Sequence, residues 1–229
     1  MSIAEKIAKT EERIQKTCDL SGRKRSEITL MGVSKFVPLT AVEEAYRAGI
    51  RCFGESRVQE GTNKFDAFKK DHPDVSLHMI GSLQRNKAKQ AALFFDCIQS
   101  ADRQELVEEI AKHALARNKP VEILFELHTG EMTKSGFASL DELYKAVQTT
   151  LEKPGLIPAG LMTMAPFTDD TDAVRASFRQ LVKAQNELRR RFPLKENWNC
   201  LSMGMSNDFE TAIEEGSTML RIGSLIFKE

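Results

Sequence analysis

The sequence predicts an α/β fold, a single (β/α)8 TIM barrel with an extra N-terminal helix. Short apolar runs alternate with amphipathic helical patterns along the chain, which is the element order of a parallel sheet. There are eight such runs, the number at which this sheet closes, and the 229 residues approach the about 250 typical of these barrels. A doubly wound open sheet is the alternative arrangement. No low-complexity linker divides the chain, so residues 1–229 are expected to form one domain.

The elements can be placed in order from the pattern. An amphipathic helix at 5–18 comes first, with an apolar stripe that includes Ile7, Ile14 and Cys18. The predicted strands follow at 29–34, 51–54, 77–81, 95–100, 121–127, 157–164, 199–203 and 219–223. Helical patterns between them include 39–49, 103–118 and 172–191, which end at glycine or shortly before proline. Only six residues follow the last strand, so the first helix is expected to cover that side of the barrel.

Composition excludes several classes of function. The formal net charge is zero, which argues against nucleic-acid binding and offers no attraction to anionic membranes. No signal peptide or membrane-spanning apolar run is found, so the four scattered cysteines are interpreted as reduced thiols in a cytoplasmic protein. The four histidines show no metal-ligand spacing and are interpreted as surface or satisfied core residues.

A barrel of this type carries its site at the carboxyl ends of the strands. The segment "GMSNDFETAI" places Ser206 and Asn207 before a predicted helix, with Glu210 three residues after Asn207 as in a capping box. The segment "RIGSLIF" places Gly223 and Ser224 after the last strand. Barrels commonly bind phosphate between these two loops. Each loop alone is an ordinary turn, but the pair at this position predicts a phosphate site.

Lys35 ends the first predicted strand, where its amine can cross the mouth toward a phosphate on the far side. A neutral amine attacks an aldehyde to form a Schiff base. Arg221, two residues before Gly223, can point into the same mouth. The alternative is a solvated lysine at a strand end. Motifs of other sites are missing: "GEMTKS" lacks the glycine before the lysine of a P-loop, and no G-x-G-x-x-G or G-x-S-x-G occurs.

Six segments of the sequence are specific enough to compare with known families: "GVSKFVPL", "FGESRVQE", "HMIGSLQRNK", "TKSG", "LMTMAP" and "LSMGMSNDFETAIEEGSTMLRIGSLIF". Together they resemble the YggS/PROSC family of pyridoxal phosphate homeostasis proteins. The resemblance spans about residues 29–227 and implies the pyridoxal-phosphate barrel of fold type III, as in the N-terminal half of alanine racemase.

The resemblance implies a cofactor site as well. Lys35 would carry pyridoxal 5′-phosphate as a Schiff base, Arg221 would face the pyridine nitrogen, and Met203 would flank the ring or its phosphate loop. The phosphate ligands would be Ser206, Gly223 and Ser224. Ser56 stands where the family usually has asparagine, which shortens one side chain near the cofactor.

Three functions are compatible with these residues. The first is a pyridoxal phosphate carrier for cofactor homeostasis, with little or no catalysis and with pyridoxal-phosphate-dependent client enzymes as partners. The second is a weak amino-acid racemase, and the third is a Schiff-base aldolase acting on a sugar phosphate. In the racemases a second domain supplies a catalytic tyrosine; this sequence is expected to lack that domain, and both of its tyrosines, Tyr46 and Tyr144, fall in predicted helices. The first function is therefore preferred, for a monomer or weak dimer.

Overall fold

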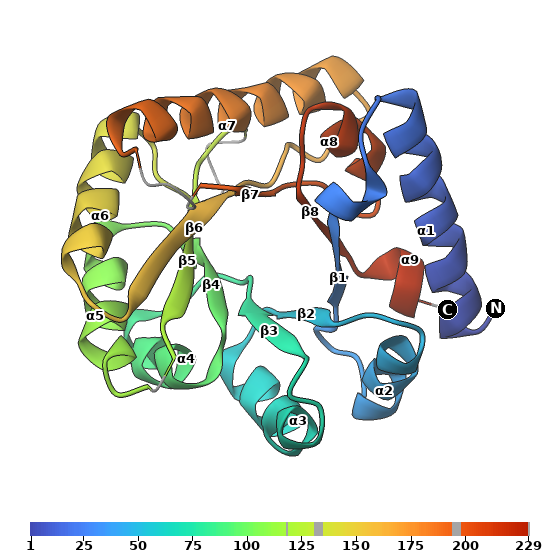
Figure 1. Ribbon diagram of the computed structural model, residues 1–229, viewed down its shortest axis with the longest axis horizontal. Helices are drawn as coiled ribbons and strands as arrows, with labels where there is room; N and C mark the ends of the chain where they lie inside the picture. Colours follow the sequence, from blue (N-terminus) through green and yellow to red (C-terminus); the bar gives the residue numbers. More distant parts are fainter. Residues whose placement is uncertain (118, 131–134, 194–197, 229) are drawn as a thin grey trace.

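A computed structural model describes residues 1–117, 119–130, 135–193 and 198–228. It confirms a closed barrel of eight parallel strands, which pair in chain order until β8 returns to β1 (Figure 1). The strands are β1 Thr29–Val33, β2 Cys52–Glu55, β3 Ser76–Met79, β4 Cys97–Ala101, β5 Val121–Glu126, β6 Leu156–Met162, β7 Cys200–Ser202 and β8 Met219–Ile222. All eight predicted strands are present, and the closed order excludes the doubly wound sheet.

Helices surround the barrel and connect successive strands (Figure 1). They are α1 Ile3–Leu20, α2 Leu39–Arg47, α3 Val58–Asp71, α4 Ala88–Phe94, α5 Gln104–Ala114, α6 Leu140–Glu152, α7 Thr171–Arg191, α8 Phe209–Glu214 and α9 Ser224–Phe227, with 3₁₀ turns η1 Arg25–Glu27 and η2 Arg85–Lys87. The helix predicted at 103–118 is shorter than expected and ends at Ala114, where the backbone continues in turn-like bonds such as Ala116 N–H to His113 O. Residue 118 lies outside the described residues.

The N-terminal helix closes the outer ring as the sequence predicts. Ser2 and Glu5 form a capping box at the start of α1, and Ile7, Ile14 and Cys18 bury its apolar stripe. This helix packs against α2, α8 and α9. Lys6 Nζ donates to the carbonyl oxygen of Lys228 at 2.7 Å, so the two ends of the described chain are tied together. Helix α1 thus covers the side of the barrel where the described residues after β8 form the short helix α9.

Both faces of the strands are buried, which explains their almost continuous apolar character. Met31, Cys52 and Met219 form one small cluster inside the barrel, and a second holds Cys97, Leu124 and Met162. Their neighbours along the strands face outward into the main core beneath the helices. Side-chain direction along each strand can therefore be assigned from this alternation.

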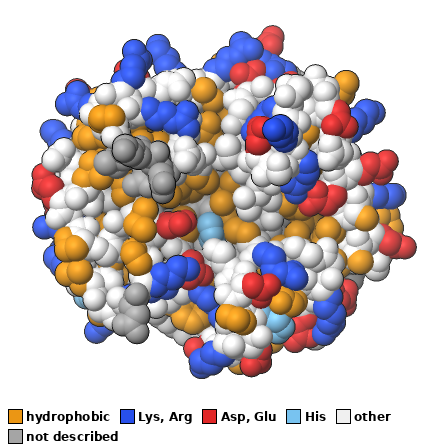
Figure 2. Space-filling view, in the orientation of Figure 1, with side chains coloured by type: hydrophobic (Ala, Val, Ile, Leu, Met, Phe, Trp, Pro, Cys, Tyr) orange, Lys and Arg blue, Asp and Glu red, His pale blue; other side chains and the backbone are white. Residues whose placement is uncertain are grey.

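The exterior carries charges of both signs, interspersed around the face in Figure 2 as the zero formal charge suggests. In the described part of the chain, no helix is long and apolar enough to span a bilayer. The four cysteines are free thiols. Burial raises the pKa of Cys200 to about 12, so this thiol is protonated at neutral pH.

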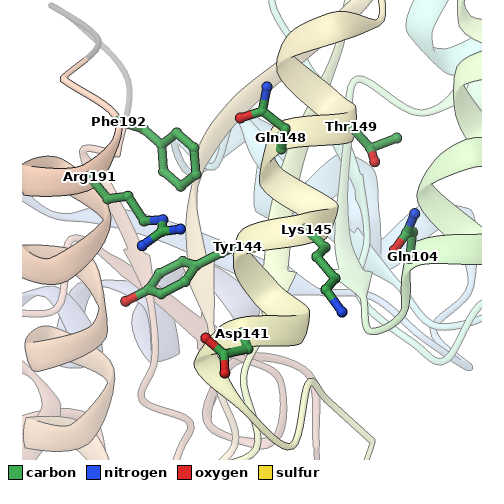
Figure 3. A pocket seen from close by; sticks show the side chains of 8 residues that line it. All are labelled: Gln104, Asp141, Tyr144, Lys145, Gln148, Thr149, Arg191 and Phe192. Atoms are coloured by element: carbon green, nitrogen blue, oxygen red, sulfur yellow. The ribbon is translucent and has the colours of Figure 1, made fainter.

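The helix layer also holds a cavity of about 550 Å3 between α6 and the end of α7, with Gln104 of α5 on one side (Figure 3). The guanidinium of Arg191 lies 4.6 Å from the ring centroid of Tyr144, and Phe192 borders the same space. None of the residues predicted to hold the cofactor lines this cavity, which lies outside the barrel.

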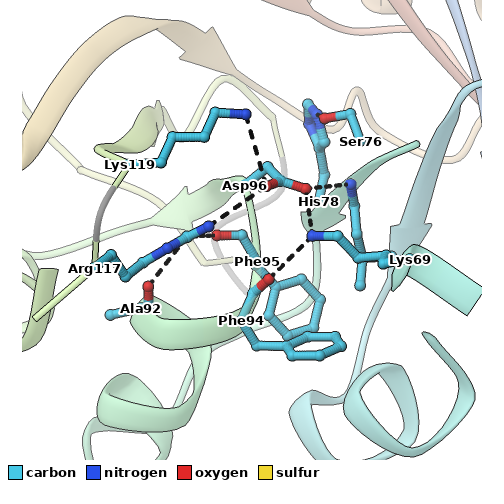
Figure 4. A network of polar contacts seen from close by, with 10 residues as sticks. Lys69, Ser76, His78, Ala92, Phe94, Phe95, Asp96, Arg117 and Lys119 are labelled. Atoms are coloured by element: carbon cyan, nitrogen blue, oxygen red, sulfur yellow. Dashed lines mark hydrogen bonds and ion pairs between the residues drawn. The ribbon is translucent and has the colours of Figure 1, made fainter. Parts of the chain in front are cut away.

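One acidic residue, Asp96, organises the polar contacts before β4 (Figure 4). Its carboxylate accepts from Lys69 Nζ at 2.6 Å and from the Leu77 N–H at 2.9 Å, with Arg117 Nη2 at 3.5 Å. Burial opposes its ionisation, but the Leu77 N–H and the Lys69 ammonium, together with the charge of Lys119, outweigh burial and lower the pKa of Asp96. These contacts therefore fasten α3, β3 and the turn after α5 to the residue that precedes β4.

Replacing Asp96 with Asn should lower the free energy of unfolding by roughly 3 kcal/mol at pH 7, because largely buried cations lose their counter-charge. Urea unfolding measures this loss. Asp66→Asn is the control, since its 2.7 Å pair with Lys70 is exposed and exposed pairs contribute less than about 1 kcal/mol. Equal losses in the two variants would show that Asp96 has no special structural role.

Candidate functional site

The mouth at the carboxyl ends of the strands carries most of the predicted residues. Lys35 follows β1, Ser56 follows β2, Ser206 lies in the loop after β7, and Gly223 and Ser224 follow β8. Because β8 pairs with β1, Gly223 lies beside the end of β1. A Cβ atom built on Gly223 would lie 3.3 Å from the Cβ of Val33. Glycine therefore allows the backbone after β8 to pack closely against the end of β1.

Lys35 lies in a turn directly above β1 and its side chain is exposed. The turn is closed by the Val37 N–H, which donates to the Ser34 carbonyl at 3.0 Å. Met31 faces the barrel interior, whereas Ser34 Oγ donates outward to Glu55 at 2.7 Å. Alternation is therefore expected to direct Lys35, the next residue, toward the mouth.

Arg221 is buried inside the barrel with only 5% of its surface exposed. Its Nη1 donates to the carbonyl and the Oγ of Ser202 at 2.7 and 2.8 Å, and its Nη2 donates to the Thr163 carbonyl at 2.8 Å. Burial lowers the pKa of Arg221, although a guanidinium keeps its proton at neutral pH. Within the described residues, the guanidinium donates its hydrogen bonds to these neutral acceptors. The barrel therefore holds a positive charge without a directly paired carboxylate.

A chain of hydrogen bonds runs from Arg221 down the barrel. Ser202 Oγ donates to Gln99 Oε1 at 2.7 Å, and Gln99 Nε2 donates to His78 Nδ1 at 2.8 Å. An amide nitrogen only donates, so His78 carries its hydrogen on Nε2 and donates it to Ser76 Oγ at 2.9 Å. From Arg221 to Ser76, each group donates a hydrogen bond to the following one. The acceptor end of each group therefore points toward Arg221, and the aligned dipoles stabilise its positive charge.

His78 confirms the interpretation of a satisfied core histidine. Burial is the main cause that lowers its pKa, to about 4, so the ring is neutral at physiological pH. The amino ends of the strands form a hollow of about 250 Å3, and the lining includes His78, Glu122 and Cys97. Figure 2 shows a histidine side chain in the hollowed centre of the face it presents.

Two predictions about the loop after β7 differ from the structure. Met203 is fully buried and packs in the main core beneath the helices, on the opposite side of the chain from Ser202. It is therefore not brought to the mouth. The capping box is also wrong: α8 begins at Phe209 after Asp208, which accepts from the Met205 N–H at 2.5 Å, and Glu210 instead pairs with Arg13.

Several residues of the mouth were not found from the sequence. Glu126 ends β5, is 2% exposed, and accepts from Ser135 Oγ at 2.8 Å. Burial raises the pKa of this carboxyl. Ser202 and Gln99 were missed because they sit inside apolar runs, although the two-residue period of each strand places them on the interior face. Ser56 is half-buried, and its backbone packs closely against Gly81. A Cβ atom built on Gly81 would lie 2.3 Å from the carbonyl oxygen of Ser56.

Comparison with known proteins agrees with this geometry. The family model described as alanine racemase, N-terminal domain, matches residues 11–229. The chain is 39% identical over 229 residues to the pyridoxal phosphate homeostasis protein of Aquifex aeolicus, covering 100% of this chain and 99% of that protein. The fold and the match define a pyridoxal-phosphate-type barrel of the alanine racemase class.

Solved structures give the same result. PipY of Synechococcus elongatus, determined with PLP bound, superimposes with a TM-score of 0.84 at 32% identity, covering 99% of this chain and 100% of PipY. Alanine racemase of Enterococcus faecalis shares the fold, with a TM-score of 0.69 at 17% identity, and the match covers 97% of this chain but 57% of the racemase. The chain belongs to the pyridoxal phosphate homeostasis protein family.

The buried state of His78 predicts a pH dependence of stability. Its folded pKa is about 4, whereas unfolded histidine titrates near about 6.5. The unfolded chain binds the extra proton between these values, so His78 accounts for a loss of up to roughly 3 kcal/mol as the pH falls through this window, and none above it. Urea unfolding from pH 4 to 7 should show a shallower slope for His78→Gln. His113→Gln, outside the barrel, is the control, and a wild-type slope in His78→Gln would contradict the assignment.

Proposed function

We propose that this protein binds pyridoxal 5′-phosphate as a Schiff base on Lys35 and serves the homeostasis of that cofactor, with little or no catalysis. One observation carries the proposal: an exposed lysine after β1 and a buried arginine on β8 belong to neighbouring strands of one barrel mouth. The printed names of the relatives and the PLP-bound PipY structure support the same cofactor.

The residues present fit the group. Bound pyridoxal phosphate would supply an aldehyde that condenses with the Lys35 amine, forming a C=N bond with release of one water. The hydroxyls of Ser206 and Ser224 and the open backbone at Gly223 would hold the phosphate on the neighbouring loops. Ser56, beside Gly81 after β2, would border the ring from the other side.

Arg221 would face the pyridine nitrogen. Three of its five N–H donors are used by Ser202 and Thr163, which leaves donors for a ring acceptor. A guanidinium only donates, so it would offer no acceptor to a protonated ring nitrogen; the nitrogen would stay unprotonated and the ring would withdraw electrons weakly. This residue therefore favours holding the cofactor over labilising bonds of an amino acid.

The racemase-like alternative needs a second positioned acid or base. Tyr46 lies on α2 and hydrogen-bonds to Asp74, and Tyr144 lies on α6 beside Arg191, so neither reaches the barrel interior. Glu126 is a buried carboxyl at the end of β5, and Ser135 Oγ donates to one of its oxygens. An exposed Lys35 also suits exchange of the cofactor with pyridoxal-phosphate-dependent client enzymes.

The anchor is tested with Lys35→Ala. Wild-type protein loaded with pyridoxal phosphate should be yellow, and borohydride should fix the cofactor to the peptide that contains Lys35. The variant should stay folded and colourless. Lys87→Ala, an exposed lysine at the same rim, is the control and should remain yellow. A reducible imine retained by Lys35→Ala would contradict the assignment of Lys35 as the residue that binds the cofactor.

Catalysis is tested by hydrogen exchange at the α-carbon of L-alanine in deuterium oxide. The loaded protein should exceed free pyridoxal phosphate by less than about tenfold, because the roughly 10²–10⁴-fold supplied by a positioned acid or base is missing. Exchange that is hundreds of times faster, and lost in Lys35→Ala, would favour the racemase-like function instead.

A further inference from the structure

A polar network on α3 holds the two residues that flank Lys35. On one side, Lys64 Nζ donates to the Ser34 carbonyl at 2.7 Å. On the other side, the Phe36 N–H donates to Glu60 Oε1 at 2.6 Å. Lys64 and Glu60 are themselves joined at 3.2 Å, one helical turn apart. The peptide units before and after Lys35 are therefore fastened to the same helix.

A third member, Glu55, ends β2 and is completely buried. Its Oε1 accepts from Ser34 Oγ at 2.7 Å and from Lys64 Nζ at 2.8 Å, and its Oε2 has no partner among the described residues. Burial raises the pKa of Glu55 against the opposing effect of Lys64. Buried ion pairs are costly to desolvate, and an apolar layer would join strand and helix equally well. The charged groups differ from an apolar layer because their hydrogen bonds fix the orientation of the groups that they join.

The turn also has a conformation that requires support. Phe36 has a φ of 61°, the left-handed region that bulky side chains seldom adopt. Phe36 is 68% exposed and its ring contacts the Arg57 guanidinium, whose carbon lies 5.1 Å from the ring centroid, so packing of the ring contributes little to holding the turn. The bond to Glu60 is then a main restraint on the backbone immediately after Lys35. Strained residues of this kind persist where their surroundings hold them.

We propose that Glu55, Glu60 and Lys64 act as positioning residues, forming a clamp that sets the direction from which the Lys35 amine meets the cofactor aldehyde. The inference rests on the proposed function. With both neighbouring peptides fixed, the Lys35 backbone cannot rotate, and its amine is presented at a high effective concentration. Without the clamp the amine would sample more directions, whereas the phosphate contacts after β7 and β8 would be unaffected.

The test compares two ligands on the cofactor-free protein. Pyridoxal 5′-phosphate forms the imine, whereas pyridoxine 5′-phosphate lacks the aldehyde and binds through its ring and phosphate alone. Glu60→Ala should weaken binding of the aldehyde about tenfold, the size expected for one charge-assisted hydrogen bond. Binding of the alcohol should stay at the wild-type value.

Three further variants sharpen the result. Glu60→Gln keeps an acceptor for the Phe36 N–H and should recover most of the loss. Lys64→Met should repeat the selective weakening. Glu105→Ala, the same change in the exposed first turn of α5, should leave both ligands unaffected.

The outcomes separate the clamp from the proposed function. Glu60→Ala with wild-type affinity for the aldehyde would overturn the clamp, as would equal weakening of both ligands with a lower unfolding temperature, which indicates a structural role alone. If wild-type protein binds neither ligand, the proposed function itself fails. If Lys64→Met does not fold, the Glu60 pair of variants still decides the question.

Discussion

The pairing of β8 with β1 is the contact on which the rest of the structure depends. It closes the sheet, and by closing it joins the first strand of the chain to the last. Arg221 stands opposite Met31 in that register, and Gly223 lies against Val33, so residues nearly two hundred positions apart meet at one mouth. If a sheet with the same strand order were open, β1 and β8 would lie at opposite edges, and Lys35 would be far from the loops after β7 and β8. Helix α1, packed against α8 and α9, protects this junction from outside.

Side chains of two kinds, apolar and polar, lie inside the barrel. Sulfur and aliphatic side chains such as Met31 and Leu124 fill part of it. A line of polar groups runs beside them, from the charged Arg221 through the neutral Ser202 and Gln99 to the neutral His78. Placing a guanidinium there costs desolvation, and the aligned donors offset that cost only while every member keeps its partner. Since an arginine cannot pass on a proton, the line orients a charge and does not conduct protons.

The architecture was predictable from the sequence because it depends on patterns that repeat. Eight apolar runs and a leading amphipathic helix are signals spread over many residues, and all of them appear in the structure. The exposed lysine after β1 was equally visible, since a charged residue ending an apolar strand is conspicuous. Met203 does not lie where the sequence predicts. Methionine is compatible with either face of a strand, and only the period of two along the strand decides which side its side chain takes. The N-cap of α8 was predicted wrongly because three successive residues, Ser206, Asn207 and Asp208, are all good capping residues. The sequence alone does not decide which of them precedes the helix.

Residues that support others are harder to find than residues that touch a ligand. Glu55 ends β2, whereas Glu60 and Lys64 lie one turn apart on α3, and nothing in the sequence predicts that these two elements surround the Lys35 turn. They lie on the helix side of the barrel wall, whereas Ser202 and Gln99 lie on the interior side. The candidate site is therefore held from both sides of one sheet, with the amine positioned from outside and the guanidinium from within. Since these two supports share no residue, a change in one should alter the presentation of Lys35 without moving Arg221.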